Sequence, residues 1–313
     1  MSARVEERPG AGRVLVVGSI NTDLVARTPH LPHAGETVLA HGFDTVGGGK
    51  GANQAIAAAR MGARVAMLGR VGADAAGAQR VRELAAHGID CGGIGVSDAH
   101  PTGLAMIAVS AAGENSIVVV PGANAALLPA DVEAHASCLH DCDVVVCQLE
   151  TPHETVHAAL AAARRLGKLT VLNPGPATQP LPTHWLPLID YLVPNEAEAA
   201  ILAGVTSGAG DAARALHRAG ARHVIVTLGA RGVQVIGGAD PGTHHPARAV
   251  TAVDTTAAGD TFVGALAAAL AAGSALGPAV ARAQLAASLS VQRHGAQPSI
   301  PSRDEVERLE NEV

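Results

Sequence analysis

The residues from Asp254 to Asp260 (Asp-Thr-Thr-Ala-Ala-Gly-Asp) combine small side chains with an acid, directly before a long run of alanine and leucine. That run predicts a helix over 260–272, whose first N–H groups lack intrahelical acceptors. These groups and the helix dipole favour an anion, which Ala258 and Gly259 would let approach closely. Asp260 could serve as a general base for a hydroxyl group beside that anion. The pattern suggests phosphoryl transfer, although an ordinary helix with an acid in its first turn gives the same local pattern.

Polar side chains also follow short apolar runs that are typical of buried parallel strands. Asn21 and Asp23 come after residues 13–18, and Glu150 comes after residues 143–148. Because ligand crevices of open α/β sheets lie at the strand ends, we expect these groups to meet a small polar ligand. Turn chemistry alone would also explain Asn21 and Asp23.

A glycine-rich segment over 47–51 opens an apolar helix that runs to Met61. It is not a P-loop, because Asp44 stands where the first glycine is required and Gly51 replaces Ser or Thr. The turn can still bring backbone amides and Asn53 toward a polar ligand. The first strand is not followed by a GxGxxG motif, which argues against a dinucleotide-binding dehydrogenase.

The elements that must position these groups alternate between strand and helix along most of the chain. The pattern predicts an N-terminal tail over 1–12 and one α/β domain over 13–313, with strands of a small β lid inserted at about 22–47 and 101–120. His244 and His245 stand between two prolines and are interpreted as a loop. Further helices are expected over 129–138, 153–166, 195–203, 209–219 and 278–292.

Composition excludes several classes of protein. The formal charge is −6 and the chain has only four aromatic residues, so we expect no nucleic-acid partner. The charge-free run 261–281 is interrupted by glycine and proline, so no membrane span is expected. Residues 1–12 lack an apolar signal core, which predicts a cytoplasmic protein. The four cysteines lack metal-site spacing and are expected to be free thiols, and no histidine is assigned to a metal.

Seven segments of the chain, taken together and in the order in which they occur, resemble the ribokinase family of PfkB-type sugar kinases. The resemblance implies a doubly wound αβα domain, ribokinase-like in fold, with a small β-strand lid that joins two copies into a homodimer. It also implies ATP-dependent phosphorylation of D-ribose at its 5-hydroxyl, with Mg²⁺ accompanying ATP and K⁺ as a monovalent activator. The segments that carry it are 18–23, 48–54, 148–150, 194–196, 227–232, 254–260 and 295–299.

The resemblance also implies a role for each matching residue. Asp260 would be the catalytic base, and Ala257, Ala258 and Gly259 would form the anion hole. The sugar contacts would be Asn21, Asp23, Gly49, Lys50, Gly51, Ala52, Asn53, Glu150 and Asp260. The ATP contacts would be Asn195, Thr227, Leu228, Gly229, Ala230, Arg231, Gly232, Gly259 and Gln284, the last being His or Asn in most ribokinases. Glu198 would organise Mg²⁺ indirectly, and K⁺ would lie beside Asp254, Thr256, Ser290, Arg293, Gly295 and Ser299.

The residue types favour ribose as the sugar. Asp23, Glu150 and Asp260 accept hydrogen bonds from hydroxyl groups, and Lys50 is the only cation among the sugar contacts, which suits a neutral polyol better than a sugar phosphate. Few aromatic rings are present to stack a nucleoside base. The alternatives are a related kinase acting on fructose, 2-keto-3-deoxygluconate or a ribonucleoside, a sugar-binding regulator that has lost the chemistry, and, least favoured, a dehydrogenase.

Overall fold

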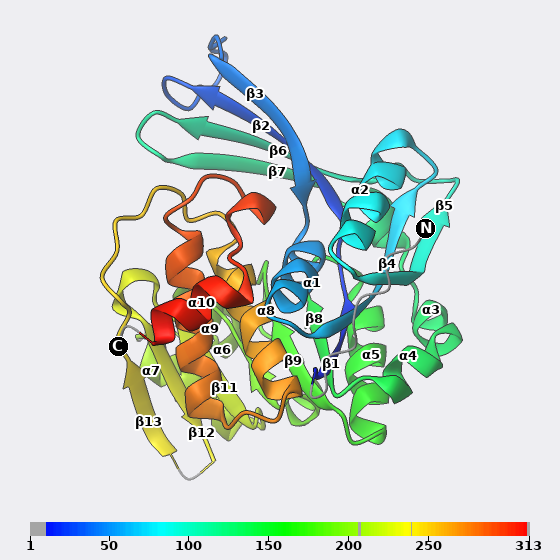
Figure 1. Ribbon diagram of the computed structural model, residues 1–313, viewed down its shortest axis with the longest axis vertical. Coiled ribbons are helices and arrows are strands. Elements are labelled where there is room, and N and C mark those ends of the chain that lie inside the picture. Colours follow the sequence, from blue (N-terminus) through cyan, green and yellow to red (C-terminus); the bar gives the residue numbers. More distant parts are fainter. Residues whose placement is uncertain (1–10, 206–207, 239, 312–313) are drawn as a thin grey trace.

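Valine-rich strands form one central sheet, and alanine-rich helices cover both of its faces, so the domain has three layers (Figure 1). The computed structural model describes residues 11–205, 208–238 and 240–311, so residues 1–10 of the expected tail lie outside it. Within those ranges the sheet has nine strands, and neighbouring strands are parallel except in the pairs β11–β12 and β12–β13, which are antiparallel. In spatial order they are β13 (Asp240–His245), β12 (Val233–Gly237), β11 (His223–Thr227), β10 (Tyr191–Leu192), β9 (Leu169–Asn173), β8 (Val144–Gln148), β1 (Arg13–Val17), β4 (Arg64–Gly72) and β5 (Asp90–Ser97).

Helices cover both faces of this sheet, and each face buries its own apolar core. Alternation along β1 shows why: Val14 and Val16 enter one core, while Leu15 and Val17 enter the other. The first core is covered by α1 (Lys50–Arg60), α2 (Ala75–Ala86), α8 (Ala258–Ala271), α9 (Leu276–Ser290) and α10 (Arg303–Glu310). The second is covered by α3 (Pro129–Ala134), α4 (Ala136–Asp141), α5 (His153–Arg165), α6 (Glu196–Ala203) and α7 (Ala209–Arg218).

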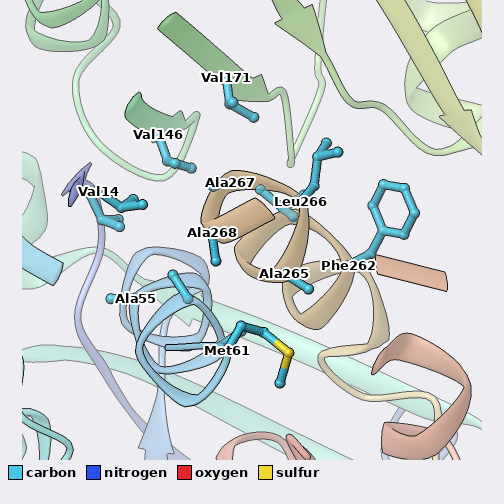
Figure 2. Packing of buried hydrophobic residues seen from close by; sticks show 14 of the residues in the cluster. Val14, Ala55, Met61, Val146, Val171, Phe262, Ala265, Leu266, Ala267 and Ala268 are labelled. Atoms are coloured by element: carbon cyan, nitrogen blue, oxygen red, sulfur yellow. The ribbon is translucent and has the colours of Figure 1, made fainter. Parts of the chain in front are cut away.

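Helix α8 is buried along nearly its whole length, which suits its sequence, since after Asp260 it carries no charged residue and is rich in alanine and leucine. Phe262 and Leu266 of α8 pack in the first core with Val146 and Val171 of the sheet, and Ala55 of α1 lies nearby (Figure 2). The helix start carrying Asp260 is therefore fixed by a closely packed core.

A second sheet of four strands extends from one end of the main sheet, at the top of Figure 1. Strand β2 begins at Asn21 and pairs with β3 on one side and β6 on the other. This sheet therefore leaves the domain just after β1, next to the carboxyl ends of the main strands. Its order is β3 (Gly42–Gly48), β2 (Asn21–Thr28), β6 (Gly103–Ser110) and β7 (Asn115–Val120).

Three details differ from the sequence expectations. The loop predicted around His244 and His245 is the end of β13, and β5 was not predicted. Both are edge strands of the main sheet, where proline and glycine are tolerated although they obscure the strand pattern. The helix expected over 129–138 is two short helices, because the backbone at His135 leaves helical geometry. No helix within the described ranges is long and apolar enough to cross a membrane.

Candidate active site

Asp260 lies in the first turn of α8 and is 7% exposed. Two neighbouring amides of α1 hold its carboxylate: Asn53 Nδ2 donates to Oδ2 at 3.0 Å, and Gln54 Nε2 donates to Oδ1 at 2.9 Å. These contacts require α1 and α8 to lie very close together. Gly264 allows this, since a Cβ there would come within 2.5 Å of the Ala57 Cβ and the Gln54 carbonyl oxygen. The acid is thus fixed by the packing of two helices distant in sequence.

The start of α8 has the geometry of an anion site. Ala257 is the N-cap and adopts a left-handed conformation with φ of 59°, which is unfavourable for a residue with a Cβ. Its carbonyl accepts the Thr261 N–H, and the Ala258 N–H bonds to Thr255. No acceptor among the described residues takes the N–H groups of Gly259 and Asp260. A Cβ on Gly259 would meet no atom within 4 Å, so the space beside these donors is open.

The predicted sugar contacts converge from β2, the start of α1 and the end of β8. Asn124 Nδ2 donates to Asn21 Oδ1 at 2.7 Å, which fixes the Asn21 side chain. Asp23 lies against Gly48, where a Cβ would come within 2.1 Å of both carboxylate oxygens. Gly49 has φ of 88° and turns the chain from β3 into α1. These glycines therefore permit the close approach of β2 and β3 at the site.

Glu150 is held by a serine that the sequence analysis did not assign. Ser19 Oγ donates to Glu150 Oε2 at 2.5 Å, and the Lys50 N–H donates to the same oxygen at 3.1 Å. Ser19 also accepts from the N–H groups of Gly51 and Ala52, through its hydroxyl and its carbonyl respectively. Ser19 therefore joins the end of β1 to the start of α1 and to Glu150.

Four acids and one lysine determine the electrostatics of the site. Burial, with Glu150 and Asp260 nearby, raises the pKa of Asp23 to about 7, although Arg80 opposes this. Asp260, followed by Glu150 and Glu198, raises the pKa of Lys50, while burial opposes the rise. A Cβ on Gly175 would lie 2.8 Å from Glu198 Oε1 and 3.2 Å from Lys50 Nζ. Lys50 is therefore a half-buried positive charge among carboxylates.

Several buried polar atoms in this region lack a partner among the described residues, and two of them are side-chain oxygens of predicted sugar contacts. Asp23 Oδ1 and Asn53 Oδ1 are shielded from solvent and find no hydrogen bond within the described part of the chain. Buried acceptors are rarely left in this state unless a ligand or water completes them. Asp23 lines a cavity of about 400 Å³ that also contacts Asp254, Thr256 and Gly295. The cavity runs beneath the second sheet and is large enough for a monosaccharide.

The predicted ATP contacts line two neighbouring cavities at the ends of β10 and β11. Asn195 forms a parallel bridge to Thr227, which brings the two segments together. One cavity, of about 560 Å³, contacts Asn195, Thr227, Leu228 and Gly229. The other, of about 480 Å³, is mostly apolar, and the predicted residues that line it are Thr227, Gly229, Ala230, Gly232, Ala258, Gly259 and Gln284. It extends to the open start of α8.

Four of the residues predicted to lie near the nucleotide already bond to other groups of the protein. Arg231 pairs with Glu196, and Gln284 Nε2 donates to the His245 carbonyl at 3.1 Å. Glu198 Oε2 accepts the Asn195 N–H at 2.9 Å, and Asn195 Oδ1 accepts the Glu198 N–H at 2.8 Å. This is a capping box at the start of α6, in which Glu198 is the third helical residue; its carboxylate also lies near Lys50.

The residues predicted to surround K⁺ gather where 253–256 meets 291–299. Asp254 accepts the N–H groups of Thr256 and Gly295, each at 2.9 Å. Burial alone would raise the pKa of Asp254, but donors from Thr256 and Gly295 outweigh it and lower the pKa. Arg293 pairs instead with Glu305. Within the described ranges no cluster of three His, Cys, Asp or Glu side chains forms a metal site, so a cation here would rely on Asp254 and backbone carbonyls.

The two serines in this set donate their hydroxyl hydrogens to backbone carbonyls. Ser290 Oγ donates to the Ala287 carbonyl at 2.9 Å, and Ser299 Oγ donates to the Ala296 carbonyl at 2.7 Å. Donation of the hydrogen leaves the lone pairs of each hydroxyl oxygen free, so either serine could contact a cation through its hydroxyl or its carbonyl oxygen.

Sequence reasoning missed the amides behind Asp260. Gln54 also donates to Asn173 Oδ1 at 3.0 Å and accepts from Gln148 Nε2 at 2.7 Å. Gln148 and Asn173 were recognised only as polar residues at strand ends. The sequence did carry one signal that Gln54 is buried: it lies among apolar residues of an alanine-rich helix.

The fold and the site have the geometry of an α/β phosphotransferase: ligand groups at the carboxyl ends of parallel strands, an open helix start and a buried acid beside it. The chain belongs to the pfkB family of carbohydrate kinases, whose family model matches residues 11–303. This confirms the family and the enzyme class predicted from the sequence.

Relatives in this family match almost the whole chain. Ribokinase of Haemophilus influenzae is 42% identical over 296 residues, covering 93% of this chain and 95% of that protein. Deoxyribokinase of Salmonella typhi is 38% identical over 293 residues, covering 92% and 95%. The structure of Arabidopsis thaliana ribokinase complexed with ribose and ATP has a TM-score of 0.88 and 33% identity, covering 96% of this chain and 98% of that one. The predicted ribokinase-like α/β fold is thereby confirmed.

Proposed function

We propose that this chain transfers the terminal phosphoryl group of ATP to the 5-hydroxyl of D-ribose, giving D-ribose 5-phosphate and ADP. The observation that carries the proposal is the buried carboxylate of Asp260 beside the open start of α8. Similarity to the Haemophilus influenzae ribokinase and to the Arabidopsis thaliana complex with ribose and ATP supports this choice of substrates.

In the proposed reaction, Asp260 accepts the proton of the sugar hydroxyl as that oxygen bonds to the γ-phosphorus. The bond from this phosphorus to the oxygen bridging it to the β-phosphate breaks, and ADP leaves. The N–H groups at the start of α8 and the charge of Lys50 stabilise negative charge on the transferring group. A positioned base typically contributes about 100- to 10,000-fold in rate, so removing the Asp260 carboxylate should lower the rate of phosphoryl transfer by a factor in this range.

The proposed sugar site uses the two unpartnered acceptors. Asp23 Oδ1 and Asn53 Oδ1 would accept hydrogen bonds from hydroxyl groups of ribose, and Asn21 and Glu150 would complete its contacts. Gly49, Gly51 and Ala52 supply the backbone beside the sugar. On the nucleotide side, the apolar cavity containing Gln284 would hold the adenine, and Thr227 to Gly232 would pass beside the phosphates.

Two cations belong to the proposal. Bound with the nucleotide, Mg²⁺ supplies charge neutralisation for the phosphates, and Glu198 is the residue that would hold it indirectly. Asp254 and the carbonyls around Gly295 would hold K⁺ at the loop that precedes α8. The donors that keep Asp254 ionised favour a cation at this position.

We also propose that the second sheet acts as a lid and joins two copies of the chain. Strand β7 is exposed along its whole length, and its residues include four consecutive apolar ones, Ile117 to Val120. Met106 lies opposite Val118 on the same face of the sheet. A second lid would bury this apolar surface.

Sedimentation velocity should give a dimer for the natural chain and a smaller species for Val118→Glu, and a monomeric natural chain would contradict the dimer. A cytoplasmic location stays a prediction from the sequence.

The similarity to Salmonella typhi deoxyribokinase makes 2-deoxy-D-ribose a second candidate substrate. The test is a panel of D-ribose, 2-deoxy-D-ribose, fructose, 2-keto-3-deoxygluconate and adenosine with MgATP, followed by coupled ADP release. NMR then locates the phosphate on the product. The proposal expects the highest kcat/KM for D-ribose and phosphate on its 5-oxygen. A higher kcat/KM for another compound of the panel would make that compound the proposed substrate in place of ribose. No ADP release with any compound would favour a sugar-binding protein without kinase activity.

A further inference from the structure

Gln54 is buried with no exposed surface and lies at the centre of a chain of amides that ends on Asp260. Gln148 of β8 donates to Gln54, and Gln54 donates to both Asn173 of β9 and Asp260 of α8. Side chains from β8, β9 and α8, all distant in sequence from α1, thus meet at this one side chain of α1. A glutamine in a core of this kind requires partners for all its polar atoms, and here it has them.

The direction of each hydrogen bond in this chain is determined by its two ends. Asn173 Nδ2 donates to the Val193 carbonyl at 2.8 Å, so the Asn173 oxygen must face Gln54. An ionised Asp260 carboxylate can only accept. The Gln54 atom between these two acceptors must therefore be its NH₂ group, and its oxygen must face Gln148. A flipped Gln54 amide would place three oxygens together.

The two oxygens of Asp260 consequently have different surroundings. Oδ1 is held by Gln54, whose other contacts are all within the core. Oδ2 is held by Asn53 alone among the described residues, and Asn53 has its own oxygen without a partner. Asn53 can therefore rearrange around an incoming hydroxyl group, whereas Gln54 cannot.

We infer that Gln54 is a positioning residue: it anchors Oδ1 of Asp260 so that Oδ2 is the oxygen presented to the sugar hydroxyl. Asn173, whose oxygen accepts from Gln54, keeps the Gln54 amide in the donating orientation. Gln148 only supplies a donor to the Gln54 oxygen, and Gly18 makes room for Gln148. A Cβ at Gly18 would lie 1.9 Å from Gln148 Oε1. This inference rests on the proposed function, because it assigns the proton transfer to Asp260.

The test compares two buried amides of the same network. Gln54→Met keeps the side-chain length and removes the donor to Asp260. Gln148→Met removes an equally buried amide that does not touch Asp260. Steady-state kinetics with D-ribose and MgATP, together with thermal melts, are measured for both variants. A loss of orientation at the base lowers kcat with little effect on KM, because the binding groups remain.

We expect Gln54→Met to lower kcat about 10- to 100-fold, with KM for both substrates within about threefold of the natural enzyme. Gln148→Met should keep kcat within about threefold at a comparable loss of thermal stability. Equal losses of kcat in the two variants, or a rise in KM without a loss of kcat in Gln54→Met, would overturn the inference. Should Gln54→Met not fold, Gln54→Leu replaces it, since its side chain is apolar and cannot donate to Asp260. The same loss of kcat is expected, and unchanged kcat would overturn the inference.

Asp260→Asn, measured in parallel, separates this inference from the proposed function. An inactive Asp260→Asn with a fully active Gln54→Met would refute the positioning role alone. A fully active Asp260→Asn would refute both.

Discussion

The carboxyl group of Asp23 should make the unliganded protein less stable as the pH rises through neutrality. Burial and the neighbouring Glu150 and Asp260 raise its pKa to about 7, from an ordinary value of 3.8. Between these two values the folded state keeps a proton that the unfolded state has released. The stabilisation that this proton provides is complete below about pH 4 and is lost as the pH rises through about 7.

The size of the effect follows from the two pKa values. One pKa unit corresponds to about 1.4 kcal/mol, so stability should fall by about 2.5 kcal/mol between about pH 5 and pH 8 through this group alone. Asp23→Asn removes the titration without changing the shape of the side chain. The difference in unfolding free energy between Asp23→Asn and the natural chain should therefore grow by about this amount over the same pH range.

Equilibrium urea unfolding without sugar or nucleotide measures this difference. Asp44→Asn is the matched control, because Asp44 lies on the neighbouring strand β3 but is about half exposed in an ion pair with Arg27. Exposed pairs of this kind contribute about 0–1 kcal/mol and should give no comparable trend. A difference between Asp23→Asn and the natural chain that is constant from about pH 5 to pH 8 would refute the electrostatic reasoning.

Three further predictions concern packing, the cation loop and the thiols. Gly264→Ala should destabilise the protein by about 1–3 kcal/mol in urea unfolding, because its Cβ would lie 2.5 Å from Ala57 and force α1 and α8 apart. Gly277→Ala in α9, where a Cβ meets nothing within 4 Å, should instead stabilise by about 0.5–1 kcal/mol, and equal effects would disprove the close-approach argument. Replacing Na⁺ with K⁺ at constant ionic strength should raise kcat, and indifference to the cation would remove K⁺ from the loop at Asp254. Burial raises the pKa of Cys142 to about 11 and that of Cys147 to about 12, so iodoacetamide at neutral pH should label both much more slowly in the folded than in the urea-unfolded protein, and equal rates would contradict their burial.

Much of the fold could be predicted from local pattern, since runs such as Arg13–Val17 and Val144–Gln148 are apolar on both faces and end in polar groups. The edge strands β5 and β13 could not, because glycine and proline weaken the strand pattern where only one neighbour is paired. Helix 129–138 was predicted as continuous because nothing in the sequence at His135 indicates the break.

The candidate site was predictable where a motif is contiguous and obscure where it depends on packing. The sequence of segment 254–260 is enough by itself to indicate an anion site and a base. The partners of Asp260 were not apparent, because Gln54 lies 206 residues away in the chain and Gln148 reaches Gln54 across 94 residues. Whether an amide is buried, and against which carboxylate, is determined by the approach of α1 and α8, which depends on Gly264.

The most direct test of the central claim, that Asp260 takes the proton as ATP phosphorylates the sugar, is the single-turnover rate of Asp260→Asn. The variant is first shown by calorimetry to bind D-ribose and a non-hydrolysable ATP analogue, and is then mixed with ribose and MgATP. The account predicts near-normal binding and a rate of D-ribose 5-phosphate formation at least about 100-fold below that of the natural enzyme. A variant that binds both ligands and forms product at the natural rate would contradict it.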